Sequence, residues 1–416
     1  MLLPLTKNYA SHLIDTMKNF FSSLGRYKSE VLLVFVIVLP LVFISIWQSR
    51  ASGEVCDNAG INRQKCFAEE IDRILSTKGL DKAFDALIVF SKKDENFASA
   101  CHANAHGIGK VAYLRFASGE KIEYTPKMSY CGYGFFHGFI IALFADTGSI
   151  DKAILFCKSL EAPSGSISGG TQACFHGIGH GTVDGDDPNI WGNPALILHP
   201  GIEMCKRLPK EDNAQYLCQT GAYNQLEFFS QDSKYKLKSL SDAPYSFCNS
   251  EPRARRQGCY TNMIPAVLRI TKNDIGEAAR YILPRITYPD DSTIDNFYVD
   301  EMVIIGLFHE FIRLHLGQPK IIIEGIKLCH EFSSERVRLA CAAGVGGGYM
   351  KYDAPESAYD NWRSFCDNPA LREDERQACY KYVLSRISLW YNAPRAKKIC
   401  KSVPTQYRSY CKNTAE

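Results

Sequence analysis

The sequence predicts an all-α fold, a disulfide-stapled α-solenoid of two-helix repeats that follows one N-terminal transmembrane helix. Three observations predict it: sixteen cysteines that all lie after residue 55, an uncharged apolar segment at 31–47 that precedes them, and short patterns that recur along the rest of the chain. An even number of cysteines on one side of an apolar segment indicates an oxidising compartment and a disulfide framework.

The apolar segment 31–47 reads VLLVFVIVLPLVFISIW. With flanking residues it is long enough to cross a hydrocarbon core of about 30 Å. The basic residues that precede it favour a cytoplasmic N-terminus; they are Lys7, Lys18, Arg26 and Lys28. A cleaved signal peptide is the alternative, with small residues for cleavage at 51–53, but the leader before the segment is long for a signal peptide. We therefore expect an uncleaved membrane anchor.

This segment divides the chain into four predicted parts. Residues 1–30 form a short cytoplasmic segment, 31–47 the transmembrane helix, 48–55 a linker and 56–416 an extracytoplasmic helical-repeat domain. The sequence contains no Asn-X-Ser/Thr glycosylation site. That absence favours a prokaryotic cell surface over a eukaryotic secretory protein.

Most cysteines form pairs whose spacing suits a loop between two consecutive helices. The pairs are Cys56/Cys66, Cys157/Cys174, Cys205/Cys218, Cys248/Cys259, Cys329/Cys341, Cys366/Cys379 and Cys400/Cys411. Cys101 and Cys131 remain, because Leu87 stands where a partner of Cys101 is expected and no cysteine precedes Cys131 in the repeat frame. We expect these two to bond each other, which gives eight bridges.

The helix after the second cysteine of a pair opens in a recurrent way. Four such openings carry a glycine three residues after the cysteine, namely Gly134, Gly177, Gly221 and Gly344. The cysteine and this glycine share one helical face. A glycine there lets a neighbouring helix approach closely.

The helix before the first cysteine also repeats. Its opening at Leu80 aligns with the openings at Ile150 and Ile275. In the repeat that starts at Ile275, Ile282 and Val303 occupy the two cysteine positions. Loss of both cysteines together is what a bonded pair predicts.

Consecutive two-helix segments of this kind resemble tetratricopeptide and Sel1-like helical repeats over residues 56–416. The resemblance implies a curved stack whose concave face binds a protein or peptide. The function it predicts is a membrane-anchored extracytoplasmic binding scaffold, attached to the membrane through residues 31–47.

Histidines gather on the helices that follow the second cysteines. His102 and His106 are four residues apart, as are His176 and His180, so each pair lies on one helical face. His137, His180 and His309 hold the same repeat position, six residues after the cysteine position, and equivalent positions stack in a solenoid. Imidazoles brought together in this way bind zinc or another divalent transition metal.

Two further residues extend the candidate site. Asp184 continues the four-residue steps of His176 and His180, and Glu310 neighbours His309 as a base or a partner of a metal ligand. The alternative function is therefore a metal-dependent enzyme, such as a hydrolase. The histidines have a structural alternative too, since a polar residue at a constant packing position hydrogen-bonds neighbouring carbonyls, a role that Asn224 fits in the same frame.

Composition excludes one class of partner. The formal net charge is only +3, and the chain has no long basic stripe with interleaved aromatic residues. A nucleic-acid-binding groove needs such a stripe. We therefore expect no nucleic-acid partner.

Overall fold

The computed structural model describes residues 56, 63–160, 169–287, 293–294, 297–318 and 320–411. Residues 61–416 form one compact unit. The described chain is helical apart from two antiparallel two-residue strands, β1 (Thr293–Ile294) and β2 (Phe297–Tyr298). The predicted cytoplasmic segment, transmembrane helix and linker, residues 1–55, lie outside the described residues. Within the described ranges, no helix combines the length and apolar character needed to cross a bilayer.

The α-helices keep one order along the chain. They are α4 (Arg63–Lys78), α5 (Leu80–Lys93), α6 (Glu95–Ser99), α7 (Cys101–Ala117), α8 (Gly134–Thr147), α9 (Ile150–Ser159), α10 (Gly170–Thr182), α11 (Pro194–Cys205), α12 (Ala214–Ser230), α13 (Lys238–Asp242), α14 (Pro244–Ser250), α15 (Arg253–Asn262), α16 (Ile264–Ile270), α17 (Ile275–Ile282), α18 (Val299–His315), α19 (Ile321–Glu331), α20 (Glu335–Tyr352), α21 (Pro355–Cys366), α22 (Glu373–Ser385), α23 (Ile387–Trp390) and α24 (Ala393–Ser402). Short 3-10 helices lie between them: η2 (Pro126–Ser129), η3 (Pro188–Ile190), η4 (Glu211–Asn213), η5 (Ser233–Tyr235), η6 (Leu283–Arg285) and η7 (Thr405–Tyr410).

Disulfides join the end of one helix to the beginning of the next, in the pairs that the repeat frame predicts. The bridges are Cys101–Cys131, Cys157–Cys174, Cys205–Cys218, Cys248–Cys259, Cys329–Cys341, Cys366–Cys379 and Cys400–Cys411, with Cα–Cα distances of 5.4–6.1 Å. Cys56 and Cys66 are disulfide-bonded as well, so all sixteen cysteines are oxidised. Each bridge closes a short local loop and removes conformational entropy from the unfolded chain.

The repeat without cysteines has the same helix boundaries as the others. The three aligned openings predicted from the sequence are the first residues of α5, α9 and α17. Ile282 ends α17 and Val303 lies in the first turns of α18, and both side chains are fully buried. Apolar packing thus takes the place that sulfur bonds hold elsewhere.

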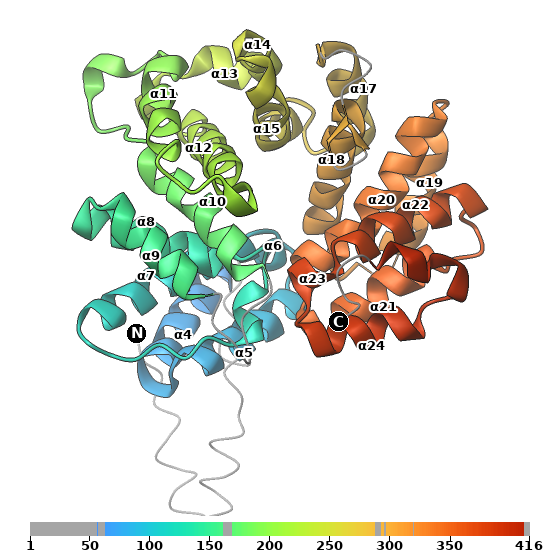
Figure 1. The fold of residues 1–416 in the computed structure, drawn as a ribbon, viewed down its shortest axis with the longest axis horizontal. Helices are drawn as coiled ribbons and strands as arrows, with labels where there is room; N and C mark the ends of the chain where they lie inside the picture. The colour runs from blue at the N-terminus through green and yellow to red at the C-terminus, as the bar shows by residue number, and fades with distance from the viewer. Residues whose placement is uncertain are drawn as a thin grey trace, which may run out of the picture. The chain divides into compact units, whose positions relative to one another are not determined.

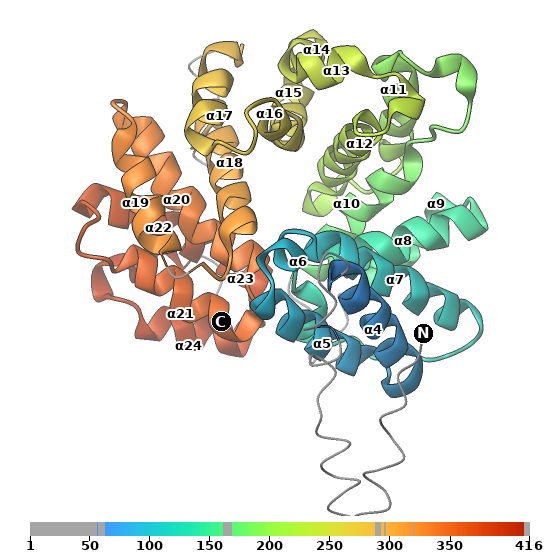
Figure 2. The same ribbon diagram turned by 180° about the vertical axis from the view of Figure 1, so that it is seen from behind.

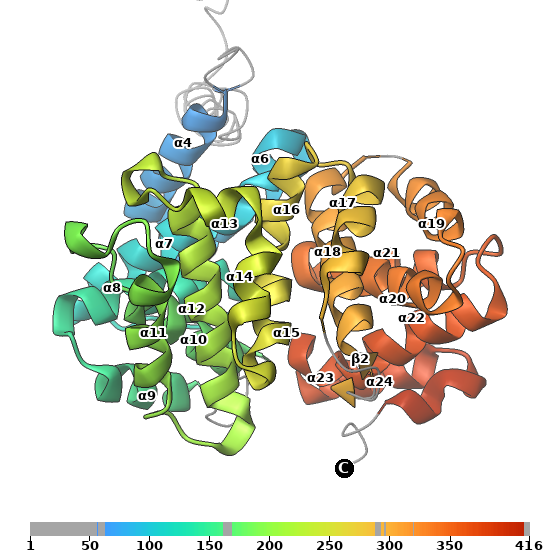
Figure 3. The same ribbon diagram turned by 90° about the horizontal axis from the view of Figure 1, so that it is seen from above.

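The helices that follow the loops pack against one another in chain order: α7, α8, α10, α12, α15, α18, α20 and α22. We call these eight the core helices. Figures 1 and 2 show the series from two sides, and Figure 3 shows α12, α15 and α18 from above. The series also returns on itself within this unit, since α6 packs against α18.

Two polar contacts fix this return. The Arg313 guanidinium donates to the carbonyl oxygen of Ser99 at 2.9 Å, and the Tyr133 hydroxyl donates to that of Leu389 at 2.5 Å. Elements more than 200 residues apart in sequence therefore border one common space between the core helices.

Glycines set the spacing between core helices, as predicted. A Cβ atom at Gly134 would lie 2.5 Å from the carbonyl oxygen of His102, and one at Gly221 would lie 1.9 Å from that of His176. Real Cβ atoms do not approach so closely, so only glycine permits these crossings. Each of these glycines lies directly against the backbone of a histidine on the preceding core helix.

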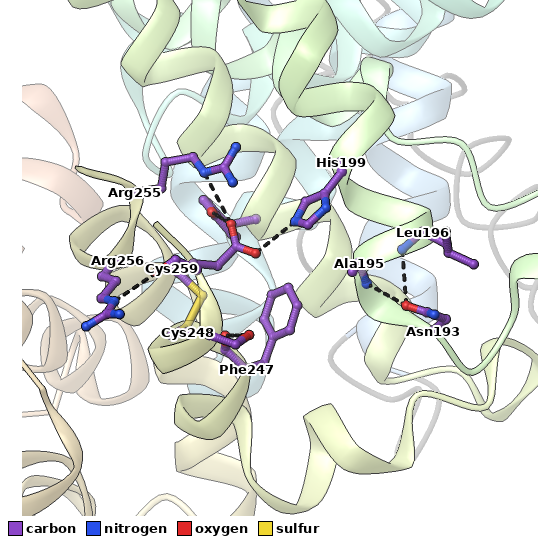
Figure 4. Close-up of polar contacts among 12 residues, drawn as sticks. Asn193, Ala195, Leu196, His199, Phe247, Cys248, Arg255, Arg256 and Cys259 are labelled. Carbon is purple, nitrogen blue, oxygen red and sulfur yellow. Dashed lines mark hydrogen bonds and ion pairs between the residues drawn. A yellow bond between two sulfur atoms is a disulfide. The ribbon is translucent and has the colours of Figure 1, made fainter. Parts of the chain in front are cut away.

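A buried carboxylate ties three consecutive helices together beside the Cys248–Cys259 bridge. Glu251 is 2% exposed, and its two oxygens accept hydrogen bonds from His199 Nε2 at 2.8 Å and the Tyr223 hydroxyl at 2.6 Å. Figure 4 shows His199 and Arg255 pointing toward the same spot next to this disulfide. Hydrogen bonds of this kind compensate a buried charge for lost hydration.

Candidate metal centre

The first histidines of the site lie on α7, held by a tight turn before α8. Cys131, Gly132 and Tyr133 have consecutive positive φ angles of 59°, 64° and 63°. This backbone is unfavourable for the two residues with side chains, by roughly 1–2 kcal/mol each. The Cys101–Cys131 bridge and the Tyr133 hydrogen bond to Leu389 hold it in place. The turn presents the Cys131 carbonyl oxygen to His102 Nδ1 at 2.7 Å.

Three imidazoles converge next to this turn. His102 Nε2 lies 3.1 Å from His106 Nε2 and 3.2 Å from His137 Nδ1, and all three ligand atoms lie within 4.8 Å of one another. Two nitrogens bound to one tetrahedral zinc, at about 2.0–2.1 Å each, are about 3.4 Å apart. The observed separations are close to this value.

Protons alone do not satisfy these nitrogens. His102 Nδ1 must carry hydrogen, because its neighbour is a carbonyl oxygen that only accepts. His102 Nε2 is therefore a bare acceptor with one lone pair in the ring plane. Two further nitrogens face that single lone pair, from His106 and His137. A cation at the shared point satisfies all three at once.

A second group contains His137, His176 and His180, with ligand atoms again within 4.8 Å of one another. His176 Nδ1 lies 2.9 Å from the Thr220 hydroxyl, which donates its own hydrogen to the Leu217 carbonyl. The hydroxyl therefore accepts from His176, and the Nε2 atom of this ring is bare.

The His180 ring has the same orientation. Its Nδ1 atom lies 3.1 Å from Gln225 Oε1, an acceptor. Its Nε2 atom is buried without a hydrogen-bond partner among the described residues. His102, His176 and His180 thus each donate from Nδ1 to an oxygen and direct a bare Nε2 inward, which is the usual pattern of histidines that bind metals.

Burial keeps the cluster uncharged. It lowers the pKa of His102 and of His180 to about 4, because the charged ring loses its hydration. Burial also brings the pKa of His106, His137 and His176 well below the usual value, and the neighbouring imidazoles add to the effect. At neutral pH all five rings are neutral, the form that coordinates metal.

The cluster forms one wall of a cavity of about 590 Å³ between the core helices. Side chains at the sixth position after the cysteine position line it on several core helices, namely His137, Asn224, Pro265 and His309. The repeat register therefore predicts residues of the cavity wall. Tyr133 and Trp390, whose ring centroids are 5.3 Å apart, line it at the point where the early and late helices meet.

Charged side chains face the cluster across the cavity. Glu310 accepts from Arg313 Nε and from the Tyr352 hydroxyl, each at 2.5 Å. Burial opposes ionisation of Glu310, but Arg313, Lys351 and these hydrogen bonds outweigh it and lower its pKa to about 2. Burial lowers the pKa of Lys351 as well.

The two lower-ranked candidates lie apart from both histidine groups. His309 lies across the cavity with its Nε2 atom buried and without a hydrogen-bond partner among the described residues. Asp184 is exposed and accepts from the backbone N–H of Asp186. Because α10 ends at Thr182, the four-residue step does not bring Asp184 onto the helical face of His176 and His180.

Sequence reasoning missed several residues of the site. Lys351, Tyr352 and Arg313 belong to no recognised motif, and they meet the histidines only through the return of the core helices. Thr220 and Gln225 are also absent from the predicted site, although each follows a recurrent cysteine and lies on the helix next to α10. Comparisons with protein-family models, with curated protein sequences and with solved structures found no match.

Proposed function

We propose that this protein is a metal-dependent enzyme, with a divalent transition metal such as zinc held by His102, His106, His137, His176 and His180. The observation that carries the proposal is the convergence of His106 and His137 on the bare Nε2 atom of His102, at 3.1 and 3.2 Å. A site of three protein nitrogens leaves a coordination position for water or substrate.

Hydrolysis is the reaction class that this arrangement supports best. A zinc-type ion lowers the pKa of bound water to about 7 and so supplies a nucleophile at neutral pH. The histidines border a cavity whose volume is within the usual range of small-molecule sites. Across it, Glu310 holds the Tyr352 hydroxyl and the Arg313 guanidinium in fixed positions for contact with a bound molecule.

A binding scaffold remains the second candidate. Its support is the position of the cavity, where equivalent residues of successive helix pairs meet, as on the concave faces with which helical-repeat proteins bind peptides. In this proposal the helix pairs form a solenoid, and the histidines serve only as hydrogen-bonding groups.

The proposed location is the same for both candidates. We place the helical domain on the extracytoplasmic side of a membrane, with residues 31–47 as anchor. The oxidation of all sixteen cysteines supports an oxidising compartment.

Metal analysis of the purified full chain, expressed with export to an oxidising compartment, separates the two candidates. After exposure to Zn²⁺ and dialysis, the metal-dependent enzyme retains at least about one ion per chain. Replacing both His102 and His137 with alanine is expected to abolish this retention, because it removes two of the three converging nitrogens.

His315→Ala is the matched control. His315 lies at the end of α18 and bonds the carbonyl oxygen of Phe311 in its own helix, so its loss leaves the cluster intact. Folded wild-type protein that retains no Zn²⁺, Co²⁺, Mn²⁺ or Cu²⁺ after dialysis contradicts the enzyme proposal and leaves the scaffold.

A further inference from the structure

The cavity contains one cation more than its carboxylates neutralise. The charged side chains in its wall are Glu227, Arg269, Glu310, Arg313 and Lys351. Glu227 pairs with Arg269, and Glu310 pairs with Arg313. Among the described residues, no carboxylate oxygen lies within ion-pairing distance of the Lys351 ammonium.

The Lys351 ammonium also lacks a hydrogen-bond acceptor in the described protein. Its nearest recorded contact is with the face of the Tyr352 ring, 4.9 Å from the ring centroid. Tyr352 is buried and its hydroxyl is held by Glu310, so the ring is fixed. Desolvation of a cation with so few partners is costly. An anion in the cavity compensates this cost.

Lys351 lies next to the histidine cluster. A Cβ atom at Gly132 would lie 3.4 Å from His102 Nδ1 and 3.7 Å from Lys351 Cε, so both side chains reach the same point of the wall. The positive charge of Lys351 also contributes to the lowered pKa of His102, His176 and His309. The ammonium is therefore within electrostatic range of both sides of the cavity.

A metal ion makes the excess of positive charge larger. Neutral imidazoles contribute no negative charge, so a divalent ion on the cluster keeps its full charge of +2. With Lys351 the cavity then carries a net charge of +3, because Glu227 and Glu310 already neutralise the two arginines. Such a site selects ligands with negatively charged oxygens.

We propose that the molecule bound in this cavity carries an anionic oxygen group, a phosphate or a carboxylate, that binds to the Lys351 ammonium beside the histidine cluster. This inference rests on the proposed metal-dependent function and names its substrate class. Lys351 is then the residue that selects anionic ligands, while the histidines hold the metal. The groups that hold Arg313 and Arg269 in ion pairs leave Lys351 as the anion's main contact.

Isothermal titration calorimetry of the full chain with inorganic phosphate, and separately with succinate, tests the proposal in metal-free and zinc-loaded protein. We expect at least one of the two anions to bind, and the Lys351→Met variant to bind it about ten- to a hundredfold more weakly, as for the loss of a hydrogen bond to a charged group. Lys351→Arg retains the charge and is expected to bind it more tightly than Lys351→Met. Preference for phosphate or succinate identifies the anionic group.

Lys110→Met is the control, because Lys110 is exposed on α7, the helix of His102 and His106, and its loss changes the net charge equally. Near-ultraviolet circular dichroism checks that each variant is folded. Wild-type protein that binds neither anion, or a folded Lys351→Met variant that binds as tightly as wild type, overturns the proposal. Binding that depends on Lys351 in a chain that retains no metal leaves the anion site and removes the metal-dependent function.

Discussion

The crossing of α10 and α12 makes the most direct test of how this fold positions its histidines. A Cβ atom at Gly221 would lie 1.9 Å from the His176 carbonyl oxygen and 3.2 Å from the Gly179 Cα atom. A carbon and a carbonyl oxygen in contact are usually about 3.3 Å apart. In Gly221→Ala the two backbones must therefore separate by about 1.4 Å.

This separation has two costs. Overpacking of this kind typically destabilises a protein by about 1–3 kcal/mol, and here the obstructing atom belongs to the backbone, which places the cost near the upper value. Alanine recovers about 1 kcal/mol through its higher helix propensity. We expect the free energy of unfolding to fall by about 2 kcal/mol.

Metal binding is expected to suffer as well. A shift of about 1.4 Å in the backbone of His176 is large beside the tolerance of about 0.2 Å in a metal–ligand bond. We therefore expect the affinity for Zn²⁺ to fall at least about tenfold, which corresponds to about 1.4 kcal/mol.

The assay is chemical unfolding under non-reducing conditions, followed by circular dichroism, together with a competitive zinc titration. Gly107→Ala is the matched control: Gly107 is exposed in the middle of α7, and a Cβ atom there meets nothing within 4 Å. It should raise stability by up to about 1 kcal/mol and leave zinc affinity unchanged. Equal stability and equal zinc affinity for both variants refute the close-crossing argument.

Two further predictions concern acid stability and the repeat frame. In metal-free protein, the pKa of His180 is about 4 when folded and about 6.5 when unfolded, so the unfolded chain binds the proton first and stability falls as the pH drops from about 6.5 to 4, by about 3 kcal/mol for this ring alone. Unfolding curves across this pH range should be less steep in pH for His180→Gln, and an identical slope contradicts the argument. Replacing Ile282 and Val303 with cysteine should create a ninth disulfide, because they occupy the cysteine positions of the repeat frame; two free thiols in the oxidised, denatured variant contradict that register.

Local features of this fold were predictable from the sequence because they depend on short loops and on helical periodicity. The Cys205–Cys218 bridge joins neighbouring helix ends, so spacing alone indicates it. His102 and His106 share a face because four residues make about one helical turn. Gly221 indicated a close crossing because it recurs at a fixed distance from a cysteine.

The cavity as a whole was not predictable in the same way. Its far wall contains Lys351, and its closure depends on the bond between Tyr133 and Leu389, which are 256 residues apart in sequence. That contact is the sum of many small rotations between successive helix pairs, and no local pattern encodes the sum. Asp184 shows the reverse limit: its spacing suited the face of His180, but α10 ended two residues earlier.

The cysteine, glycine and histidine of each repeat therefore form one device. The bridge fixes where a core helix begins, the glycine three residues on brings its backbone against the preceding helix, and the residue at the sixth position then reaches the cavity. In α8 and α10 these residues are His137 and His180, whose ring centroids are 5.2 Å apart. With a larger side chain than glycine at the crossing, imidazoles on adjacent helices would stand too far apart to share an ion. The close crossings, which cost stability if altered, are thus what allows separate helix pairs to assemble a single site.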